Sequence, residues 1–390
     1  MNNRFYLIGP TESILTKRGN RFPNIADFLT AEGENVFYYT SDFYHAEKRF
    51  FDKREKKCAI KSCNYYLKVL PVLGYSNNVS IRRVLSNFFF SLNIFFILLF
   101  KTKKGDKIII PSRPVELIFF ISLINRIKKT SIYLDIQDIW PDALKIKNKN
   151  KEKVFEIYCN LFLKHSLKFY TNTFHVAPSF KKWLNRYAPK VPSVFLPLGW
   201  ENCRWNIKPQ YKEYSTNENE CINLVCVAQL QHQINIMPIL ELLKTNKKVN
   251  LTVIGEDGNG ERYSEVEEFI NKNCINNIKI IGKVKREDMV NLLINMDIGI
   301  LPMITSSIPN KIFDYIASYL PIIVLGQNDS ADFVKKNNIG WSCDFNSEDL
   351  IKLIKSINSS DYLEKRKQVQ KIRCSFSRNE LNKILKETIE

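Results

Sequence analysis

Short apolar runs rich in β-branched residues alternate with amphipathic stretches along nearly the whole chain. The apolar runs predict strands at Phe5–Gly9, Val36–Tyr39, Lys107–Ile110, Ser131–Asp135, Val194–Leu196, Ile222–Ala228, Val249–Ile254, Ile278–Ile281, Ile298–Leu301 and Pro321–Leu325. In the first half, helices are predicted between the strands at Asn24–Glu32, Ile81–Phe100, Val115–Ile127 and Val154–Phe169. Apolar runs this short, each followed by a helix, indicate parallel strands that are buried on both faces of a sheet.

This pattern predicts an α/β protein made of two doubly wound, Rossmann-like domains. A polar stretch follows the last strand of the first half, so the domain boundary is expected within Gly199–Glu220. We therefore assign residues 1–200 to an N-terminal domain and residues 201–390 to a C-terminal domain. After a strand-like piece at Gly340–Cys343 the chain is predicted to be helical to its end, and these terminal helices could cross back to the N-terminal domain.

The excess charge of the chain is confined to its first half. The 390 residues include 58 Lys or Arg and 40 Asp or Glu, which gives a net charge of +18. Residues 1–200 hold 33 basic and 15 acidic residues, whereas residues 201–390 hold 25 of each. A basic half joined to a neutral one predicts that the first domain meets a membrane, a nucleic acid or another large anion. Because no nucleic-acid-binding motif is recognisable, we expect no nucleic acid partner.

The most apolar segment is 88–100, with cations at 82–83 before it and at 101–104 after it. This run of 13 residues contains Ser91 and Asn93, and we expect it to be too short to span a bilayer as a helix. It could pack on the sheet as an ordinary helix, or it could lie partly in the membrane interface with its cationic ends on anionic headgroups. The basic runs Lys53–Lys61 and Lys145–Lys153 could join the same surface.

The nine cysteines are scattered, and with only four histidines they show no paired metal spacing. We expect reduced, mostly structural cysteines and no metal or other cofactor. The N-terminus begins with the strand-like Phe5–Gly9 and lacks the pattern of a signal peptide, so a cytoplasmic location is expected.

Candidate chemistry gathers in the second half, where predicted strands end in loops. The segment Val253–Gly258 places Gly255 just past a strand, at the edge where a parallel sheet opens toward a ligand. Glycines at this place are weak evidence, because many turns between a strand and a helix contain them.

A stronger pattern covers residues 297–324, in which a strand, a Ser/Pro/Asn loop, a helix and a further strand follow one another. Backbone N–H groups at the helix start near Asn310 form a natural anion site, and Lys311 adds a cation in the first turn. One turn later, Asp314 could accept hydrogen bonds from two neighbouring hydroxyl groups. An anion site beside a diol acceptor is the chemistry expected for a nucleoside diphosphate.

Two segments carry a resemblance to a known family. Residues 297–324 include Pro309-Asn310-Lys311, an aromatic-acid-aromatic step at 313–315 and a proline before an apolar strand. Residues 135–142 read Asp-Ile-Gln-Asp-Ile-Trp-Pro-Asp. The first segment resembles the donor site of glycosyltransferase family 4, retaining enzymes of GT-B fold, and the second resembles a motif of its bacterial surface-polysaccharide branch. The resemblance implies a metal-independent enzyme that uses a nucleotide sugar.

By this resemblance, Asp314 falls where the family has the second Glu of a Glu, seven residues, Glu pattern, which binds the ribose. The first Glu would fall at Ser306, so we expect the sugar to be held instead by backbone N–H groups around Ser307 and Ile308. Asn310 is expected to contribute to the same donor site.

A second departure from the family lies in the loop 227–233, where many members place an Arg and a Lys against the pyrophosphate. This chain has Gln229 and His232 there. We keep Gln229 as a candidate donor contact and expect Lys311 to compensate, with Lys283 or Lys285 as further candidates.

The acceptor side is expected in the first half. Asp138 follows a predicted strand and is our candidate for a catalytic or acceptor-side polar group, although it could instead cap the turn before Trp140. Arg113, after another strand, could bind an acceptor phosphate, and Gln137 is a further candidate acceptor contact.

These observations together predict a glycosyltransferase that moves a sugar from a nucleotide sugar to a saccharide linked to polyprenyl diphosphate. The expected pathway is synthesis of capsule, O-antigen, lipopolysaccharide or a related surface polysaccharide. The expected location is peripheral, on the inner face of the cytoplasmic membrane. Two alternatives stay open: a nucleotide-sugar 2-epimerase of the same fold, for which histidines near the donor are scarce, and a non-catalytic partner that kept the fold.

Overall fold

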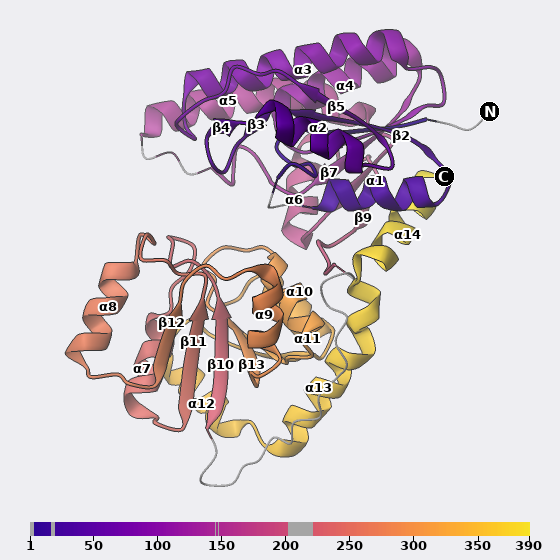
Figure 1. The fold of residues 1–390 in the computed structure, drawn as a ribbon. Coiled ribbons are helices and arrows are strands. Elements are labelled where there is room, and N and C mark those ends of the chain that lie inside the picture. Colours follow the sequence, from indigo (N-terminus) through magenta and orange to yellow (C-terminus); the bar gives the residue numbers. More distant parts are fainter. Residues whose placement is uncertain (1–3, 17–19, 145, 147, 202–220) are drawn as a thin grey trace. The chain divides into compact units, whose positions relative to one another are not determined.

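The computed structural model describes residues 4–16, 20–144, 146, 148–201 and 221–390. The chain forms two compact units, one of residues 1–196 and 382–390 and the other of residues 197–381 (Figure 1). The expected boundary region Gly199–Glu220 begins just after this division, and most of it, 202–220, lies outside the described residues.

The first unit is built on a seven-stranded sheet in which all paired strands are parallel. In spatial order the strands are β5 (Tyr66–Leu70), β2 (Asn35–Ser41), β1 (Arg4–Gly9), β6 (Lys107–Pro111), β7 (Ser131–Ile136), β8 (Asn172–His175) and β9 (Ser193–Phe195). A short antiparallel hairpin, β3 (Phe43–Tyr44) and β4 (Arg49–Phe50), follows β2. The middle strands are nearly continuous apolar runs because helices cover both of their faces.

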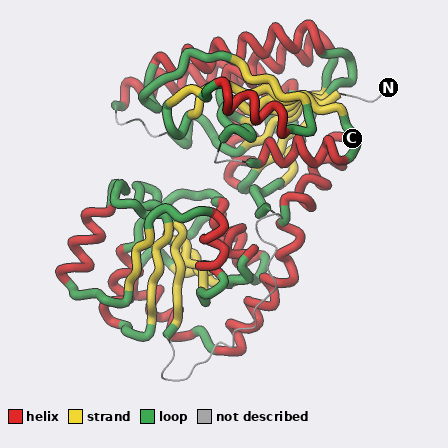
Figure 2. The backbone as a smooth tube through the Cα atoms, in the orientation of Figure 1, coloured by secondary structure: helices red, strands yellow, loops and turns green. Residues whose placement is uncertain are grey.

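The helices of this unit are α1 (Arg21–Ala31), α2 (Lys53–Ser62), α3 (Ile81–Lys101), α4 (Val115–Lys128), α5 (Lys149–Ser166), η1 (Leu167–Phe169) and α6 (Pro178–Tyr187). From β1 the chain winds first toward β5 and then, after α3, in the opposite direction toward β9. Right-handed crossovers therefore place α1 and α2 on one face of the sheet and α3, α4 and α5 on the other (Figures 1 and 2). Helix α4 packs against both α3 and α5.

The second unit contains a six-stranded parallel sheet. Its strands, in spatial order, are β12 (Ile278–Ile281), β11 (Val249–Ile254), β10 (Ile222–Val227), β13 (Ile298–Leu301), β14 (Ile322–Leu325) and β15 (Gly340–Cys343). Its helices are α7 (Met237–Thr245), α8 (Tyr263–Lys272), α9 (Arg286–Leu293), α10 (Asn310–Ala317), α11 (Asp329–Lys336), α12 (Ser347–Ser356), α13 (Ser359–Arg373) and η2 (Cys374–Phe376).

The last helix, α14 (Arg378–Ile389), contributes to both units. At its start, Arg378 forms a buried ion pair of 2.8 Å with Glu201 inside the second unit. Residues from Asn382 onward belong to the first unit, where Lys386 pairs with Glu32 at 2.9 Å.

The apolar segment 88–100 lies within α3, which is 21 residues long. An 18-residue window of α3 has a mean hydropathy of 1.8, so α3 is long and apolar enough to cross a membrane by length and composition, and the expectation of a helix too short to span was wrong. Length and composition alone are weak evidence, because core helices of soluble proteins can share them. Along one side α3 packs on α4, where the rings of Phe88 and Phe95 each lie 5.6 Å from the ring of Phe120.

Candidate functional site

Loops after four neighbouring strands of the second sheet form the candidate donor site. Because β10, β11, β12 and β13 are parallel, these loops leave the same edge of the sheet, where open α/β sheets bind their ligands. Two of them are joined through their backbones. Ile234 and Met303 form an antiparallel bridge, and the N–H of Asn235 donates to the carbonyl of Pro302 at 3.1 Å. The loop after β10 therefore lies against the loop that leads into α10.

One buried side chain fixes α10 to this edge. The Tyr315 hydroxyl accepts a hydrogen bond from the N–H of Val227 at 2.9 Å. It also lies 3.2 Å from the carbonyl of Val225 and 3.3 Å from that of Ile300, to either of which it can donate. A Cβ at Gly299 would stand 2.5 Å from the tyrosine ring, so the glycine leaves room for it. The helix start is thereby held at a defined place beside β10 and β13.

The turn before α10 presents a row of unpaired backbone N–H groups. Within the described chain, the N–H groups of Ser307, Ile308, Asn310 and Lys311 have no hydrogen-bond acceptor. Pro309, the residue that precedes the helix, offers no side-chain acceptor to them. Unpaired N–H groups at the positive end of a helix are a favourable place for an anion.

Lys311 places a cation in the first turn of this helix. Its side chain is half-buried, and burial lowers the pKa of its ammonium group. The Cys226 thiol and the Asp314 carboxylate act in the opposite direction. No described residue forms a hydrogen bond or an ion pair with the ammonium. A partly desolvated cation that has no ion-pair partner in the described chain, beside unpaired N–H groups, is suited to binding a phosphate.

The oxygens of the same turn are used to hold it in place. The hydroxyl of Ser330 donates to the carbonyl of Ser307 at 2.5 Å, and the hydroxyl of Ser306 accepts from the N–H of Asp329 at 3.1 Å. Ser306, where the resemblance places a Glu in the family, thus caps the beginning of α11. The oxygens of the turn thus bind it to the start of α11, while its N–H groups have no acceptor in the described chain.

The structure therefore gathers the five expected donor residues of this segment, Ser307, Ile308, Asn310, Lys311 and Asp314, in one turn and the start of one helix. Asn310 is exposed, Ile308 is buried, and Asp314 is half-buried one turn further along. Their role in binding a donor stays a prediction.

The loop after β11 is organised by a buried carboxylate, Glu256. Its Oε2 accepts the N–H of Leu230 at 2.5 Å, which ties this loop to the loop after β10. Its Oε1 accepts the N–H groups of Gly258 at 2.8 Å and Gly260 at 3.2 Å. Gly255 begins the loop with a φ of 102°, which strongly favours glycine. Glu256 had no predicted role, although an acidic residue between glycines directly after a strand was a signal for it.

Asp257 binds two side chains that were expected near the phosphates. The Nε2 of Gln229 donates to its Oδ1 at 3.1 Å, and the Nζ of Lys283 lies 2.5 Å from its Oδ2. Lys283 lowers the pKa of the Asp257 carboxyl. Since Gln229 and Lys283 are engaged with this carboxylate, Lys311 is the stronger candidate for a phosphate contact.

In the first unit, Asp135 is the fully buried centre of a polar network at the end of β7. Arg21 of α1 binds it with two hydrogen bonds of 2.7 and 3.0 Å, and also donates to the carbonyl of Leu196 at 3.0 Å. The Nε2 of Gln137 donates to Asp135 at 2.8 Å. The amide of Gln137 is thus engaged inside the protein, and its expected acceptor contact stays a prediction. Arg21 was missed because its partner lies on a distant strand.

Asp138 and Arg113 lie together after neighbouring strands of the first sheet. The Nη1 of Arg113 is 3.1 Å from the Oδ2 of Asp138. The other carboxylate oxygen accepts the N–H of Ile139 at 3.0 Å, and the N–H of Asp138 donates to the hydroxyl of Ser112 at 3.2 Å. Asp138 therefore holds the turn before Trp140, which was the structural alternative, and its carboxylate is also one of the partly exposed groups at this edge. A catalytic role for Asp138 stays a prediction.

Among the residues that the structure describes, no three His, Cys, Asp or Glu side chains are grouped in a way that could hold a metal ion. The expectation that the protein works without a metal is a separate matter and stays a prediction.

Comparison with known proteins agrees with this architecture. Residues 208–373 match the family model described as Glycosyl transferases group 1. No curated protein matches the chain by sequence. Among solved structures, HepE from Anabaena in complex with UDP aligns over 99% of both chains, with a TM-score of 0.70 and 11% identity.

Two further structures align equally widely. A glycosyltransferase from Rickettsia africae ESF-5 covers 100% of this chain and 98% of its own, with a TM-score of 0.69 and 15% identity. WaaG, a glycosyltransferase involved in lipopolysaccharide biosynthesis, covers 99% of both chains, with a TM-score of 0.66 and 13% identity. The TM-scores and the coverage of both chains establish a shared fold and, at identities this low, nothing beyond the fold. The chain has the GT-B fold, with two Rossmann-like domains, which confirms the fold class predicted from the sequence.

Proposed function

We propose that this protein is a glycosyltransferase that moves a sugar from a nucleotide-sugar donor to a saccharide acceptor. The observation that carries the proposal is the half-buried ammonium of Lys311, unpaired within the described chain, next to the unpaired N–H groups of Ser307, Ile308 and Asn310. A group with a perturbed pKa at the ligand-binding edge of an α/β sheet is a candidate functional group. The match to the group 1 model, which covers α10, and the UDP in the HepE structure support a nucleoside diphosphate as the ligand.

The proposed chemistry depends on stabilising the leaving group. When the bond between the anomeric carbon and the diphosphate oxygen breaks, negative charge develops on the departing diphosphate. Lys311 and the N–H groups at the start of α10 oppose that charge, which lowers the energy of the transition state. Asp314 accepts hydrogen bonds from the ribose hydroxyls, and Asp138 acts on the acceptor side. We propose that no metal is needed and that the anomeric configuration is retained, as the family resemblance implies.

We further propose that the acceptor is linked to polyprenyl diphosphate and that the protein is peripheral on the inner face of the cytoplasmic membrane. The support is a layer of exposed apolar side chains on the first unit. On α3 they are Ile81, Leu85, Phe89, Phe96 and Phe100, and on α5 they are Val154, Ile157 and Leu161. Their spacing of three, four or seven residues places each row on one side of its helix.

Exposed lysines lie at the ends of the same two helices. They are Lys101, Lys103 and Lys104 at the end of α3, and Lys149, Lys151 and Lys153 at the start of α5. Since α3 and α5 both pack on α4, the two apolar rows and these lysines belong to one helical layer (Figure 1). An apolar surface with cationic ends matches an anionic lipid surface.

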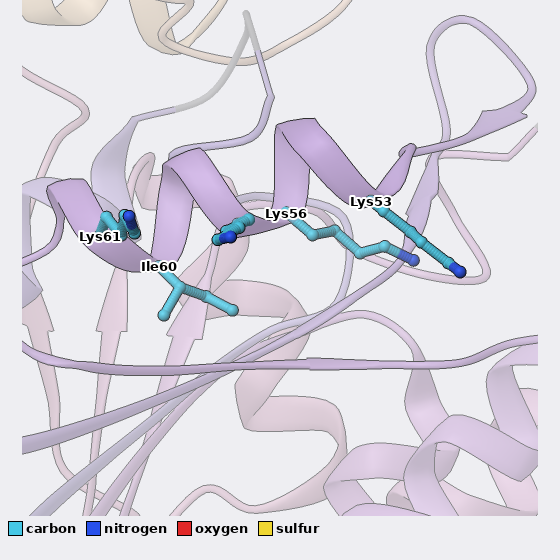
Figure 3. A pocket seen from close by; sticks show the side chains of 5 residues that line it. Lys53, Lys56, Ile60 and Lys61 are labelled. Atoms are coloured by element: carbon cyan, nitrogen blue, oxygen red, sulfur yellow. The ribbon is translucent and has the colours of Figure 1, made fainter.

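The basic run Lys53–Lys61 forms most of α2, where Lys53, Lys56, Lys57, Ile60 and Lys61 line an open hollow. Figure 3 shows the side chains of Lys53, Lys56 and Ile60 leaving the helix on the same side. Because α2 covers the opposite face of the sheet from α3 and α5, we propose that this run does not share one lipid-binding surface with the segment 88–100.

The direct test of the proposed function is turnover by the purified protein. Given a panel of nucleotide sugars, it should release nucleoside diphosphate from one donor, slowly with water and faster with an acceptor, and equally well in the presence of a chelator. Release from no member of the panel would contradict catalysis and favour the non-catalytic alternative, whereas conversion of the donor sugar to its 2-epimer would favour the epimerase.

A further inference from the structure

Three cations of the first unit approach one another at the carboxyl edge of its sheet. Lys48 follows the hairpin strand β3, Arg83 lies in the first turn of α3, and Arg113 follows β6. They come from separate parts of the chain, and each of them lowers the pKa of the same side chain, His45. We call Lys48, Arg83 and Arg113 the cation cluster.

Arg83 is the buried member of the cluster, with 8% of its surface exposed. Its guanidinium lies close to two aromatic rings, 5.0 Å from the centre of Trp140 and 5.5 Å from that of Tyr75. Its Nη1 donates to the carbonyl of Asn78 at 2.7 Å. Its Nε is buried without any hydrogen-bond partner in the described chain. A buried donor without a partner is costly, so its retention calls for an explanation such as a ligand.

Lys48 lies beside His45 and the ring of Tyr75. The Nζ of Lys48 is 3.1 Å from the Nδ1 of His45 and 4.9 Å from the ring centre of Tyr75, and it also hydrogen-bonds the side chain of Asn78. The same imidazole nitrogen lies 2.6 Å from the Tyr75 hydroxyl. Burial first, and then the three cations, lower the pKa of His45 to about 4. The imidazole is therefore neutral at pH 7 and adds no charge of its own.

Carboxylates do not neutralise the cluster. Asp138 forms its one described ion pair, with Arg113 at 3.1 Å. The Glu116 carboxyl also interacts with Arg83, but it is buried and hydrogen-bonded to Tyr158 at 2.6 Å, and burial raises its pKa. The three cations are opposed by one ionised carboxylate, that of Asp138, which pairs with Arg113. The cation cluster therefore carries an excess of positive charge in partly desolvated surroundings.

From this geometry we infer that the cation cluster binds the phosphate or diphosphate group of the acceptor substrate. The inference rests on the proposed transferase function and specifies the acceptor class within it. Arg113 is 43% exposed and can turn from Asp138 to an incoming phosphate, while Arg83 offers its unpaired Nε. An arginine whose guanidinium contacts aromatic rings is preorganised for such a contact. The Lys48 ammonium is held by the side chain of Asn78 and by His45 beside the same place. Binding of the phosphate by Arg113 would also release the Asp138 carboxylate beside the acceptor.

The test uses titration calorimetry with inorganic pyrophosphate and with farnesyl diphosphate, a short prenyl diphosphate. The variants are Arg113→Gln and Lys48→Gln, alone and combined, because both side chains are accessible and their loss should not prevent folding. Arg126→Gln, at an exposed arginine near the end of α4, is the matched control. Lys311→Met removes the donor-site cation of the other unit.

We expect the double variant to weaken the binding of farnesyl diphosphate at least about tenfold, because charge-assisted hydrogen bonds are lost. Arg126→Gln and Lys311→Met should leave that affinity unchanged. Unchanged affinity in the double variant would overturn the inference, and so would binding of pyrophosphate with no binding of farnesyl diphosphate, which would indicate a site for free phosphate. Loss of nucleoside diphosphate binding in Lys311→Met but not in the double variant would support the donor site independently. If nucleotides bind neither Lys311→Met nor the double variant, the proposed function fails. The affinity for farnesyl diphosphate still tests the cation cluster in that case.

Discussion

At the scale of a single residue, the partial burial of the Lys311 side chain affects the stability of the protein. Burial lowers its pKa, so the folded protein disfavours the protonated form and the charge reduces stability at all pH values where the lysine is charged. We predict that Lys311→Met does not lower, and can raise, the free energy of unfolding of the unliganded protein in urea. A large loss of stability would show instead that the lysine serves the fold.

A second residue-scale prediction concerns His175, which is 5% exposed at the end of β8. Burial, helped by Lys181, lowers its pKa from 6.5 to about 4. The unfolded chain therefore binds the proton more tightly, and stability falls as the pH drops through 6.5 toward 4. We predict that His175→Asn reduces the stability lost between pH 7 and pH 4 by about 3 kcal/mol.

The measurement is urea unfolding of both proteins at a series of pH values. Carboxyl groups and His45 titrate in the same range, but their effects are shared by the two proteins and cancel in the difference. Equal pH dependence of the variant and the parent would contradict the assigned cause. Above pH 7 the histidine is neutral in both states, so no pH-dependent difference is expected there.

The relative placement of Lys311 and Asp314 could be predicted from the sequence. Both residues lie on one helix, and the period of the helix fixes their separation. The partners of Gln229 could not be predicted. Its hydrogen bond to Asp257 joins loops after two different strands, and such contacts depend on loop conformations that no local pattern specifies. For the same reason the network of Arg21 and Asp135, 114 residues apart, left no signal in the sequence.

At the scale of elements, the position of α10 depends on the Tyr315 hydroxyl. Tyr315→Phe leaves the partly buried N–H of Val227 without its acceptor, which should lower the free energy of unfolding by about 1 to 3 kcal/mol. Because α10 carries the donor turn, the variant should also bind nucleotide less tightly. Urea unfolding and nucleotide titration measure the two effects.

Tyr263→Phe is the control, since its hydroxyl makes a long, exposed hydrogen bond of 3.4 Å to Glu267. It should change neither property measurably. If Tyr315→Phe binds nucleotide as tightly as the parent despite reduced stability, the anchoring of α10 would not matter for the site.

Elements with long apolar runs could be predicted, and short or polar ones could not. Strands β1, β6, β7, β10, β11 and β13 lie close to their predicted places because both faces of each are covered. Strand β8 reads Asn-Thr-Phe-His and β5 contains a lysine, so neither shows a continuous apolar run. Helix α2 was interpreted only as a charge run, because Ala59 is its one buried residue among those described.

At the scale of the whole molecule, the charge surplus of the first half is divided between two faces of its sheet. We predict that replacing Lys101, Lys103 and Lys104 by Gln weakens flotation with anionic liposomes at low salt, since about 1 kcal/mol is lost for each lysine near the lipid surface. The equal charge change at Lys53, Lys57 and Lys61 on α2 should have a much smaller effect.

Phe96→Ser combined with Phe100→Ser should weaken flotation even in neutral liposomes, because these side chains are exposed apolar residues of α3. Equal effects of the two lysine sets would contradict a membrane-binding face on the layer of α3 and α5. A wild-type protein that stays unbound at low salt would contradict membrane association altogether. The surplus of basic residues in the first half could be counted in the sequence. The distribution of these residues over the two faces of the first sheet depends on the order in which its strands are connected.

The measurement that tests the central claim most directly is calorimetric titration of UDP, GDP, CMP and dTDP into the parent protein, Lys311→Met and Lys336→Met, the last an exposed lysine of α11 that serves as control. We predict that one of the four nucleotides binds the parent and Lys336→Met with equal affinity, and binds Lys311→Met at least about tenfold more weakly. Nucleotide binding of undiminished affinity in Lys311→Met, or no binding of any of the four to the parent, would contradict a diphosphate site at the start of α10.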